Sequence, residues 1–345
     1  MTSTQWNTLL EVLDGKQFKP LPVGFIIDSP WLPGWNDISA MDYYSSDNLW
    51  LKANFNAIDT FPEIMFLPGF WSEFGMCTEP SAFGSKMVWD ETELPHADKV
   101  IHSTEMIDTL SKPNVEKDGL LPFAIKRLLH HQTIINERGH SIKFAVSRGP
   151  LNIATFLMGT TEFMLALMME PERMHKFLTI ISDFISDWLK YQIKMFPSIE
   201  GIFMLDDIVG FLGHDDIQKF VVPYLKNIYD QFDVPIKFFH NDAEGKICAP
   251  YLEEIGINLF NYSFTHSIKE MRELCGEKVT LLGNIPPRDV LANGTVDDVA
   301  NAVLSSLDGV TDRKRIIMSC GGGMPPNVST ENINAFVAAV KSQVE

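Results

Sequence analysis

The chain has 345 residues, of which 45% are apolar, and a formal net charge of −17. This charge argues against a nucleic-acid partner, because phosphate binding needs a basic surface, and against a polyanionic substrate unless the site is locally basic. Solubility alone would also explain the charge. Apolar runs end well short of the ~18 residues that a membrane span requires, so we expect no membrane segment.

The first 20 residues have the pattern of an amphipathic helix. They lack the basic and then apolar pattern of a secretory signal, so we expect this helix to stay on the mature protein. The four cysteines are too few for a disulfide framework in a chain of this length, and they suit a reducing compartment. These features together predict a cytoplasmic protein.

Short segments rich in Ile, Val, Phe and Leu recur along the chain and have the composition of strands buried on both faces. There are eight, at residues 22–28, 63–69, 142–147, 201–206, 236–240, 257–262, 279–283 and 315–319. Helical patterns lie between or after them, at residues 162–196 with a break at Pro171, 216–232, 267–275, 296–307 and 332–343. This alternation predicts an α/β fold, a single (α/β)8 barrel over residues 1–345, with an open doubly wound sheet as the alternative.

Two long segments, residues 28–62 and 70–140, follow the first two strands, and both are rich in aromatic residues in their first parts. We expect them to form helical insertions and a lid or pocket wall over the C-terminal face of the barrel. The residues that we expect to contact a substrate there are Asp28, Trp31, Phe70 and Trp71. Packing of the lid is an equally good role for the aromatic residues.

Polar residues close most of the predicted strands, at the end where barrel enzymes carry their chemistry. His240 and Asp242 end the sequence IKFFHND, and two residues so spaced in an extended segment point to the same side. Cys320 closes the eighth strand. Imidazole, thiolate and carboxylate are zinc ligands, and three protein ligands with an open fourth position are typical of catalytic zinc. We therefore predict a zinc site at His240, Asp242 and Cys320.

Each of these assignments has a structural alternative. His240 could hydrogen-bond to a loop carbonyl, and Cys320 could be a small buried apolar residue. Asp206 and Asp207 compete with Asp242 for the third ligand position, and one of the two could cap a helix while the other faces the site.

Further polar residues near strand ends are candidates for catalysis or binding. The acids that do not bind metal, together with Arg148, are candidates to orient substrate or to protonate a leaving group. His266 is a further candidate to contact substrate, with a surface or capping role as the alternative. The Gly321–Gly323 run lacks both phosphate-binding patterns and more simply allows close approach of a ligand to the backbone.

The last part of the chain contains two further motifs. A Gly-Asn-x-x-Pro turn begins at Gly283, and a Gly-Gly-x-x-Pro segment begins at Gly322 and runs into Glu331-Asn332. With the segment around residues 147–178, these motifs resemble the uroporphyrinogen decarboxylase superfamily over roughly residues 140–345. The resemblance implies a single (α/β)8 barrel.

That superfamily has two branches with different chemistry. The decarboxylase branch is metal-free and has an Arg-rich N-terminal signature, whereas the first strand here ends as GFIIDSPWLPGW, without Arg. The other branch contains zinc-dependent, corrinoid-linked methyltransferases. Its coenzyme M members have His-x-Cys and then a distant Cys, which His240 and Cys320 match in type and spacing, with Asp242 in place of the middle Cys.

The resemblance therefore implies a zinc methyltransferase that demethylates a small methylated compound, such as an aryl methyl ether. The methyl group would pass to a corrinoid on a separate protein, because no D-x-H-x-x-G corrinoid signature is present. An Asp in place of a thiolate makes zinc harder and favours an oxygen leaving group. The alternatives are a metal-free decarboxylase of the same fold and a non-enzymatic barrel that binds a corrinoid or tetrapyrrole.

Overall fold

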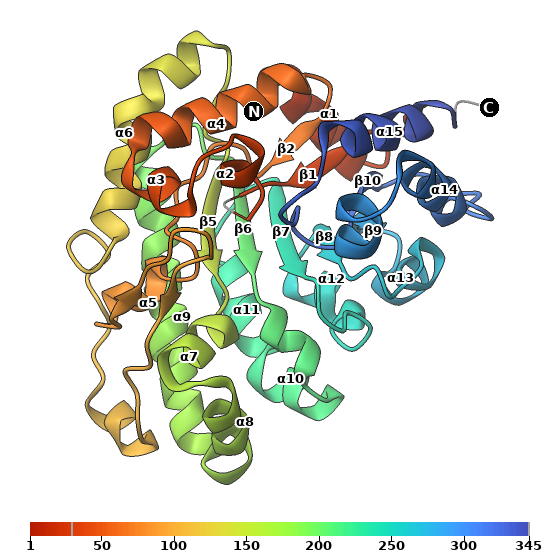
Figure 1. Cartoon of the computed structure of the whole chain (residues 1–345). Helices are drawn as coiled ribbons and strands as arrows, with labels where there is room; N and C mark the ends of the chain where they lie inside the picture. Colours follow the sequence, from red (N-terminus) through yellow and green to blue (C-terminus); the bar gives the residue numbers. More distant parts are fainter. Residues whose placement is uncertain (29, 344–345) are drawn as a thin grey trace.

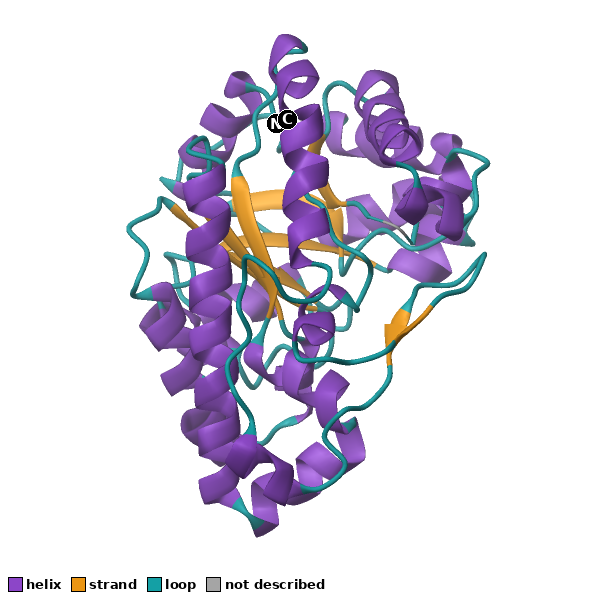
Figure 2. Ribbon diagram, turned by 90° about the vertical axis from the view of Figure 1, so that its left-hand side faces the viewer, coloured by secondary structure: helices purple, strands orange, loops and turns teal. Residues whose placement is uncertain are grey.

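Parallel strands at the centre of the molecule are surrounded by helices (Figures 1 and 2). The computed structural model describes residues 1–28 and 30–343. All eight predicted strands are present: β1 (Gly24–Ile26), β2 (Met65–Leu67), β5 (Phe144–Arg148), β6 (Gly201–Leu205), β7 (Ile236–Asn241), β8 (Leu259–Tyr262), β9 (Thr280–Ile285) and β10 (Ile316–Cys320). Strands β5 to β10 form one parallel sheet in sequential order, and β1 pairs with β2 in parallel.

The two sheets are joined by hydrogen bonds on one side, and on the other side the edge strand β5 is paired with a side chain. Isolated parallel bridges link the β1 segment to the β10 segment, which gives the strand order of an (α/β)8 barrel. No ladder joins β2 to β5 within the described residues. There the Gln192 side chain accepts a hydrogen bond from Val146 N and donates one to Val146 O, both at 2.9 Å. The side-chain amide thus replaces the missing neighbour of β5.

The inside of the barrel is filled by apolar side chains and closed at one end by α1 (Ser3–Leu13). The inner cluster includes Leu67, Phe203, Phe238, Leu259, Leu282 and Ile317. Trp6 and Leu9 of α1 belong to the same cluster, so this helix covers the N-terminal ends of the strands, as Figure 1 shows. A functional site must therefore lie toward the opposite, C-terminal ends.

The segments after β1 and β2 are more regular than expected. Their main helices, α4 (Asp47–Thr60) and α6 (Leu121–Glu137), return the chain to the start of the next parallel strand and are ordinary crossover helices. The remainder consists of α2 (Leu32–Trp35), α3 (Ala40–Ser45), α5 (Thr78–Ala82), a 3-10 turn at Thr104–Thr109 and the hairpin of β3 (Met87–Val88) and β4 (His96–Ala97). Only these shorter pieces are left to form a lid.

The helices predicted in the second half are present, including the break at Pro171, but the predicted helix 216–232 is divided into two, and the helices Pro150–Met158 and Leu252–Ile255 were not predicted. The helices of this half are α7 (Pro150–Met158), α8 (Thr160–Met169), α9 (Pro171–Met195), α10 (His214–Phe220), α11 (Val222–Tyr229), α12 (Leu252–Ile255), α13 (Ile268–Cys275), α14 (Val296–Ser306) and α15 (Thr330–Lys341). Across the described part of the chain, no single helix has the length and apolarity to cross a membrane. Helices α7 and α8 reach these values only as a pair, and they are bent by 108°.

Candidate metal centre

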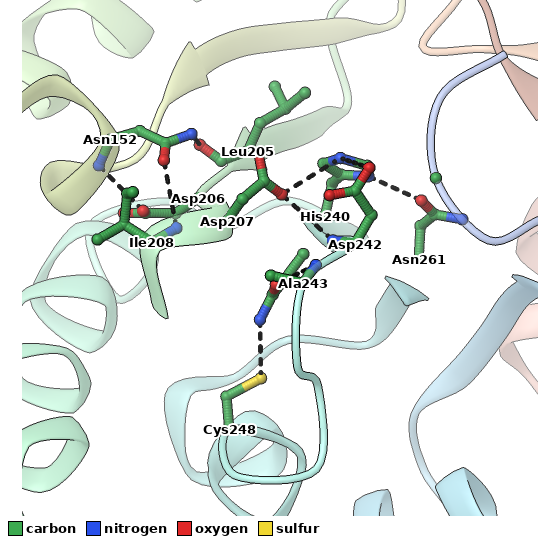
Figure 3. Close-up of polar contacts among 12 residues, drawn as sticks. Asn152, Leu205, Asp206, Asp207, Ile208, His240, Asp242, Ala243, Cys248 and Asn261 are labelled. Atoms are coloured by element: carbon green, nitrogen blue, oxygen red, sulfur yellow. Dashed lines mark hydrogen bonds and ion pairs between the residues drawn. The ribbon is translucent and has the colours of Figure 1, made fainter. Parts of the chain in front are cut away.

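Three ligand-type side chains converge where β6 and β7 end (Figure 3). Asp207 follows β6, His240 lies in β7 and Asp242 follows β7, and one ligand atom of each lies within 4.8 Å of the other two. The predicted convergence of His240 and Asp242 is therefore observed. The His240 side chain is 7% exposed, whereas those of Asp207 and Asp242 are 32% and 45% exposed. The cluster has a buried imidazole and an acidic side open to solvent.

The distances within this cluster suit a shared cation better than hydrogen bonds. His240 Nε2 lies 3.5 Å from Asp207 Oδ1 and 3.9 Å from Asp242 Oδ2. Hydrogen bonds from nitrogen to oxygen are about 2.7–3.2 Å long. In a tetrahedral site with metal–ligand bonds of about 2.1 Å, neighbouring ligand atoms lie about 3.4 Å apart. The three side chains thus stand close to the positions that a bound divalent metal requires.

Asn261 fixes the orientation of the imidazole. Its Nδ2 donates to Leu282 O at 2.8 Å and to Cys320 O at 3.2 Å. Its Oδ1 must therefore be the atom that faces His240 Nδ1, at 2.7 Å, and accept a hydrogen bond from it. With Nδ1 bound to Asn261, Nε2 is the ring atom that faces the two carboxylates (Figure 3). An imidazole oriented through its other nitrogen by a buried partner is typical of a metal ligand.

Partial burial raises the pKa of the Asp242 carboxyl above its ordinary value. The nearby Asp207 raises it further, while His240 acts in the opposite direction. A positive charge placed between this carboxyl and its neighbours would stabilise its ionised form. The electrostatics of the cluster therefore agree with its geometry in favouring a cation.

Asp206, adjacent in sequence, faces another way. It is fully buried, and its two oxygens accept hydrogen bonds from Leu151 N at 2.8 Å and Asn152 N at 3.0 Å, in the first turn of α7 (Figure 3). Burial raises the pKa of Asp206 well above its usual range, and these backbone N–H groups act against that shift. Asp206 therefore caps a helix while Asp207 faces the cluster, and the catalytic role predicted for Asp206 has no support in the geometry.

Cys320 is the predicted ligand that the structure does not bring into the cluster. Along β10 its side chain packs with Ile316 and Met318 in the outer core layer, whereas Ile317 belongs to the inner cluster. Its Sγ donates to Gly322 O at 3.3 Å, and burial raises the pKa of the thiol to about 12. The Cys320 thiol lies outside the group of ligand atoms that converge within 4.8 Å, and Asp207 is the third member of that group. Ligation by Cys320 stays a prediction.

Arg148, at the end of β5, is held by buried acids. Its Nη2 donates to both carboxylate oxygens of Glu73, at 2.9 and 2.8 Å, and its backbone N donates to Glu79 Oε1 at 3.0 Å. Burial raises the pKa of Glu73 well above its usual value, while Arg148 lowers it and Asp28 raises it further. Glu73 and Glu79 lie beyond the second strand and belong to the acids near strand ends that were candidates to orient substrate or to protonate a leaving group. Arg148 is thus already neutralised inside the protein.

The predicted substrate-contacting aromatic residues fall into two groups. Trp31 is 1% exposed and its Nε1 donates to Val328 O at 3.0 Å, and Phe70 is 2% exposed within the outer core. Both have packing roles in this structure. Trp71 instead belongs to the inner cluster, with its ring 6.0 Å from that of Phe203, which lies beside His240. Of the three, Trp71 is the best placed to contact a substrate near the cluster.

The two remaining candidates for substrate contact differ in their surroundings. His266 is 2% exposed, its Nε2 lies 2.7 Å from Glu244 Oε1 and faces Gly245 N at 3.3 Å, and its backbone carbonyl accepts a hydrogen bond from Asn284. It therefore holds the loop after β8. Asp28 is half-buried and lies close enough to Glu73 to raise that residue's pKa. Substrate contact by either residue stays a prediction.

Comparison with known proteins agrees with this fold. A family model described as uroporphyrinogen decarboxylase (URO-D) matches residues 5–343. The chain belongs to this family. The chain is 25% identical over 269 residues to a uroporphyrinogen decarboxylase of Dichelobacter nodosus, covering 76% of this chain and 75% of that protein. It is 21% identical over 271 residues to a methylated-thiol–coenzyme M methyltransferase of Methanosarcina mazei, covering 78% and 71%.

Solved structures give the same result for the fold. A methyltransferase from Methanosarcina mazei superposes with a TM-score of 0.79 over 97% of both chains, at 16% identity. A B12-independent methionine synthase from a Shewanella species superposes with a TM-score of 0.59, at 12% identity, over 94% of this chain and 96% of the other. The predicted family and barrel fold are confirmed. Since decarboxylases and methyltransferases are both among its relatives, uroporphyrinogen decarboxylase family membership alone leaves the reaction open.

Proposed function

We propose that this protein is a metal-dependent methyltransferase that moves a methyl group between a small methylated substrate and the corrinoid of a separate protein. The observation that carries the proposal is the convergence of His240 Nε2 with the carboxylates of Asp207 and Asp242, at separations of 3.5 and 3.9 Å. The similarity to a coenzyme M methyltransferase supports the reaction class. Zinc is the metal that we propose, because it accepts both imidazole and carboxylate ligands.

Each residue of the cluster has a distinct part in this proposal. Asp207, His240 and Asp242 would hold the zinc, which when bound would act as a Lewis acid toward the heteroatom that gains or loses the methyl group. Asn261 keeps His240 in the ligating tautomer. The exposed side of Asp242 leaves the centre open to a substrate. Since this set contains no thiolate, it is harder than a cysteine site and favours an oxygen donor, such as an aryl methyl ether.

The second candidate function is metal-free decarboxylation of a porphyrinogen, which the similarity to uroporphyrinogen decarboxylases supports. The charges near the strand ends argue against it. Burial lowers the pKa of Arg148, but Glu73, Glu79 and Asp28 together outweigh it and raise the pKa above its ordinary value, so the guanidinium has its counter-charges already. A substrate with many carboxylates would meet an excess of negative charge there.

Elemental analysis of the purified protein, followed by a methyl-transfer assay, tests the proposal. We expect about one zinc per chain, as three ligands with one open position imply. Zinc should be lost in His240→Ala and retained in His214→Ala, which removes an exposed histidine outside the cluster. The assay would offer aryl methyl ethers and methyl thioethers with free cob(I)alamin as acceptor. A metal-free protein that decarboxylates uroporphyrinogen would refute the proposal. Stoichiometric zinc without methyl transfer from any donor would favour a non-enzymatic corrinoid- or tetrapyrrole-binding barrel.

A cytoplasmic location remains part of the proposal. The cysteines Cys77, Cys248, Cys275 and Cys320 are all unpaired and buried, as a reducing compartment permits. The corrinoid protein would have to reach the C-terminal ends of the strands, where the metal cluster lies. Fractionation of cells with an antibody to the protein would test the location.

A further inference from the structure

A large cavity lies apart from the metal cluster, in the segments between β1 and β5. Its volume is about 1170 Å³, and its walls come from the α3–α4 junction, Phe74, Trp89 and one face of α6. None of the three metal-cluster residues lines it. Cavities that bind small molecules usually enclose about 300–1000 Å³, so this one has room for more than a single ring.

One wall of the cavity is aromatic. The rings of Tyr44 and Phe74 stack with centroids 6.2 Å apart, and Trp89 lies edge-on to both, at 5.9 and 6.4 Å. These residues come from three separate segments and pack on one another. Phe123 of α6, which is 63% exposed, also lines the cavity. A flat ring that enters would find aromatic partners for stacked or edge-to-face contact.

The α6 wall carries positive charge. Lys126, Arg127 and His130 line the cavity, at spacings that place them with Phe123 on one side of the helix. Asp47 is the lining carboxylate that opposes Lys126 and Arg127. Asp47 balances Arg127, so Lys126 gives this wall a net positive charge in a chain whose net charge is −17.

Arg127 has one donor group without a protein partner. The residue is 3% exposed, its Nε donates to Asp47 Oδ1 at 2.8 Å, and its Nη2 donates to Tyr44 O at 2.5 Å. Its guanidinium lies over Phe74, 4.5 Å from the ring centroid. Among the residues that the structure describes, its Nη1 has no hydrogen-bond acceptor. Buried guanidinium donors are rarely left unpaired, so an acceptor from outside the chain is the natural complement.

We propose that this cavity binds a flat aromatic molecule that carries one anionic group, either a carboxylate or a phosphate. The ring lies against Tyr44, Phe74 and Trp89, and the anion faces Arg127 and Lys126. An uncharged ring would provide no counter-charge for Lys126 and no acceptor for Arg127 Nη1, and an aliphatic anion would leave the aromatic wall without a partner. The site is separate from the metal centre and does not depend on the methyl-transfer proposal.

Isothermal titration calorimetry of the full chain tests this inference. The probes are 1-naphthoate and adenosine monophosphate, each compared with its uncharged counterpart, 1-naphthalenemethanol and adenosine. We expect saturable binding of at least one anionic probe, with the counterpart at least about tenfold weaker, since a charge-assisted contact exceeds that factor. Whichever anionic probe binds more tightly identifies the carboxylate or the phosphate as the preferred group.

Two charge-reversal variants locate the site. Lys126→Glu should weaken binding about tenfold, because a favourable charge becomes an unfavourable one near the anion. Lys269→Glu, on an exposed position of α13, makes the same change in net charge and should leave affinity unchanged. Both lysines are exposed, and circular dichroism would check that both variants fold.

Three results would overturn the inference: no saturable binding of either anionic probe at millimolar concentration, equal binding of the uncharged probes, or equal effects of the two lysine variants. His240→Ala should bind the probe as the unchanged protein does. Loss of binding in that variant would move the ligand to the metal centre and would also overturn the proposal. The result for methyl transfer does not enter this test.

Discussion

Replacing Asn261 by leucine, which has a similar volume, removes the group that orients His240. Three hydrogen bonds are lost, of 2.7, 2.8 and 3.2 Å, all made by a side chain with no exposure to solvent. At about 1 kcal/mol for each bond, we expect the free energy of unfolding to fall by about 3 kcal/mol. Without its Nδ1 acceptor, His240 can rotate or change tautomer, and loss of such a partner typically weakens metal binding about 10- to 100-fold.

The two effects can be measured separately. Urea denaturation of protein treated with a chelator gives the free energy of unfolding, and competition with a chromophoric chelator gives the zinc affinity. Asn258→Leu is the matched control: Asn258 accepts from Lys237 N at 2.9 Å and donates to Pro235 O at 2.8 Å, at the other end of the same strands. It should lower stability and leave zinc affinity unchanged. If Asn261→Leu lost stability but kept full zinc affinity, the tautomer argument would fail.

Three further changes test other parts of the structure. In the same competition assay, Asp207→Asn should weaken zinc binding at least about tenfold, whereas Cys320→Ala should leave zinc binding almost unchanged. Equal losses of affinity in the two variants would return Cys320 to the ligand set. Gln192→Leu removes both 2.9 Å hydrogen bonds to Val146 and should lower the free energy of unfolding, measured in urea, by about 2 kcal/mol. An unchanged free energy of unfolding would show that water replaces the amide. Burial, the nearby N-terminus and Arg138 lower the pKa of His140 from 6.5 to about 4, so the unfolded chain binds more protons in this range. Stability should fall as pH drops from about 6.5 to about 4, by at most about 3 kcal/mol, and His140→Leu should lose this dependence in pH-resolved melting.

The strands could be predicted from the sequence because each is a short apolar run with clear ends. Segments 236–240 and 201–206, for example, differ from β7 and β6 by only one residue at one end. The contact between Gln192 and β5 could not be predicted, because it joins residues 46 positions apart through one side chain. The aromatic content after the first strand suggested a lid, but Trp31 packs in the core, and a single sequence does not show which aromatic residues face inward.

The candidate site was predictable where it depended on strand periodicity. His240 and Asp242 are two residues apart, so their convergence followed from the pleat. Cys320 lies two residues after Met318 in the same strand, so both side chains point to the same side. Only the structure shows that this side faces outward. The choice between Asp206 and Asp207 depends on the backbone turn that follows β6, which the sequence does not specify. Asn261 was missed, although a buried amide in an apolar strand requires partners and was a usable signal.

The contact between Asn261 and residue 320 has a consequence for how this centre can evolve. Asn261 binds the main-chain carbonyl at that position, which every amino acid provides, and makes no use of the thiol. Mutation at position 320 can therefore accumulate without disturbing the imidazole, whereas position 261 tolerates only side chains that accept from His240 and donate to two carbonyls. Among homologues that share this geometry, we expect residue 320 to vary and residue 261 to stay an amide.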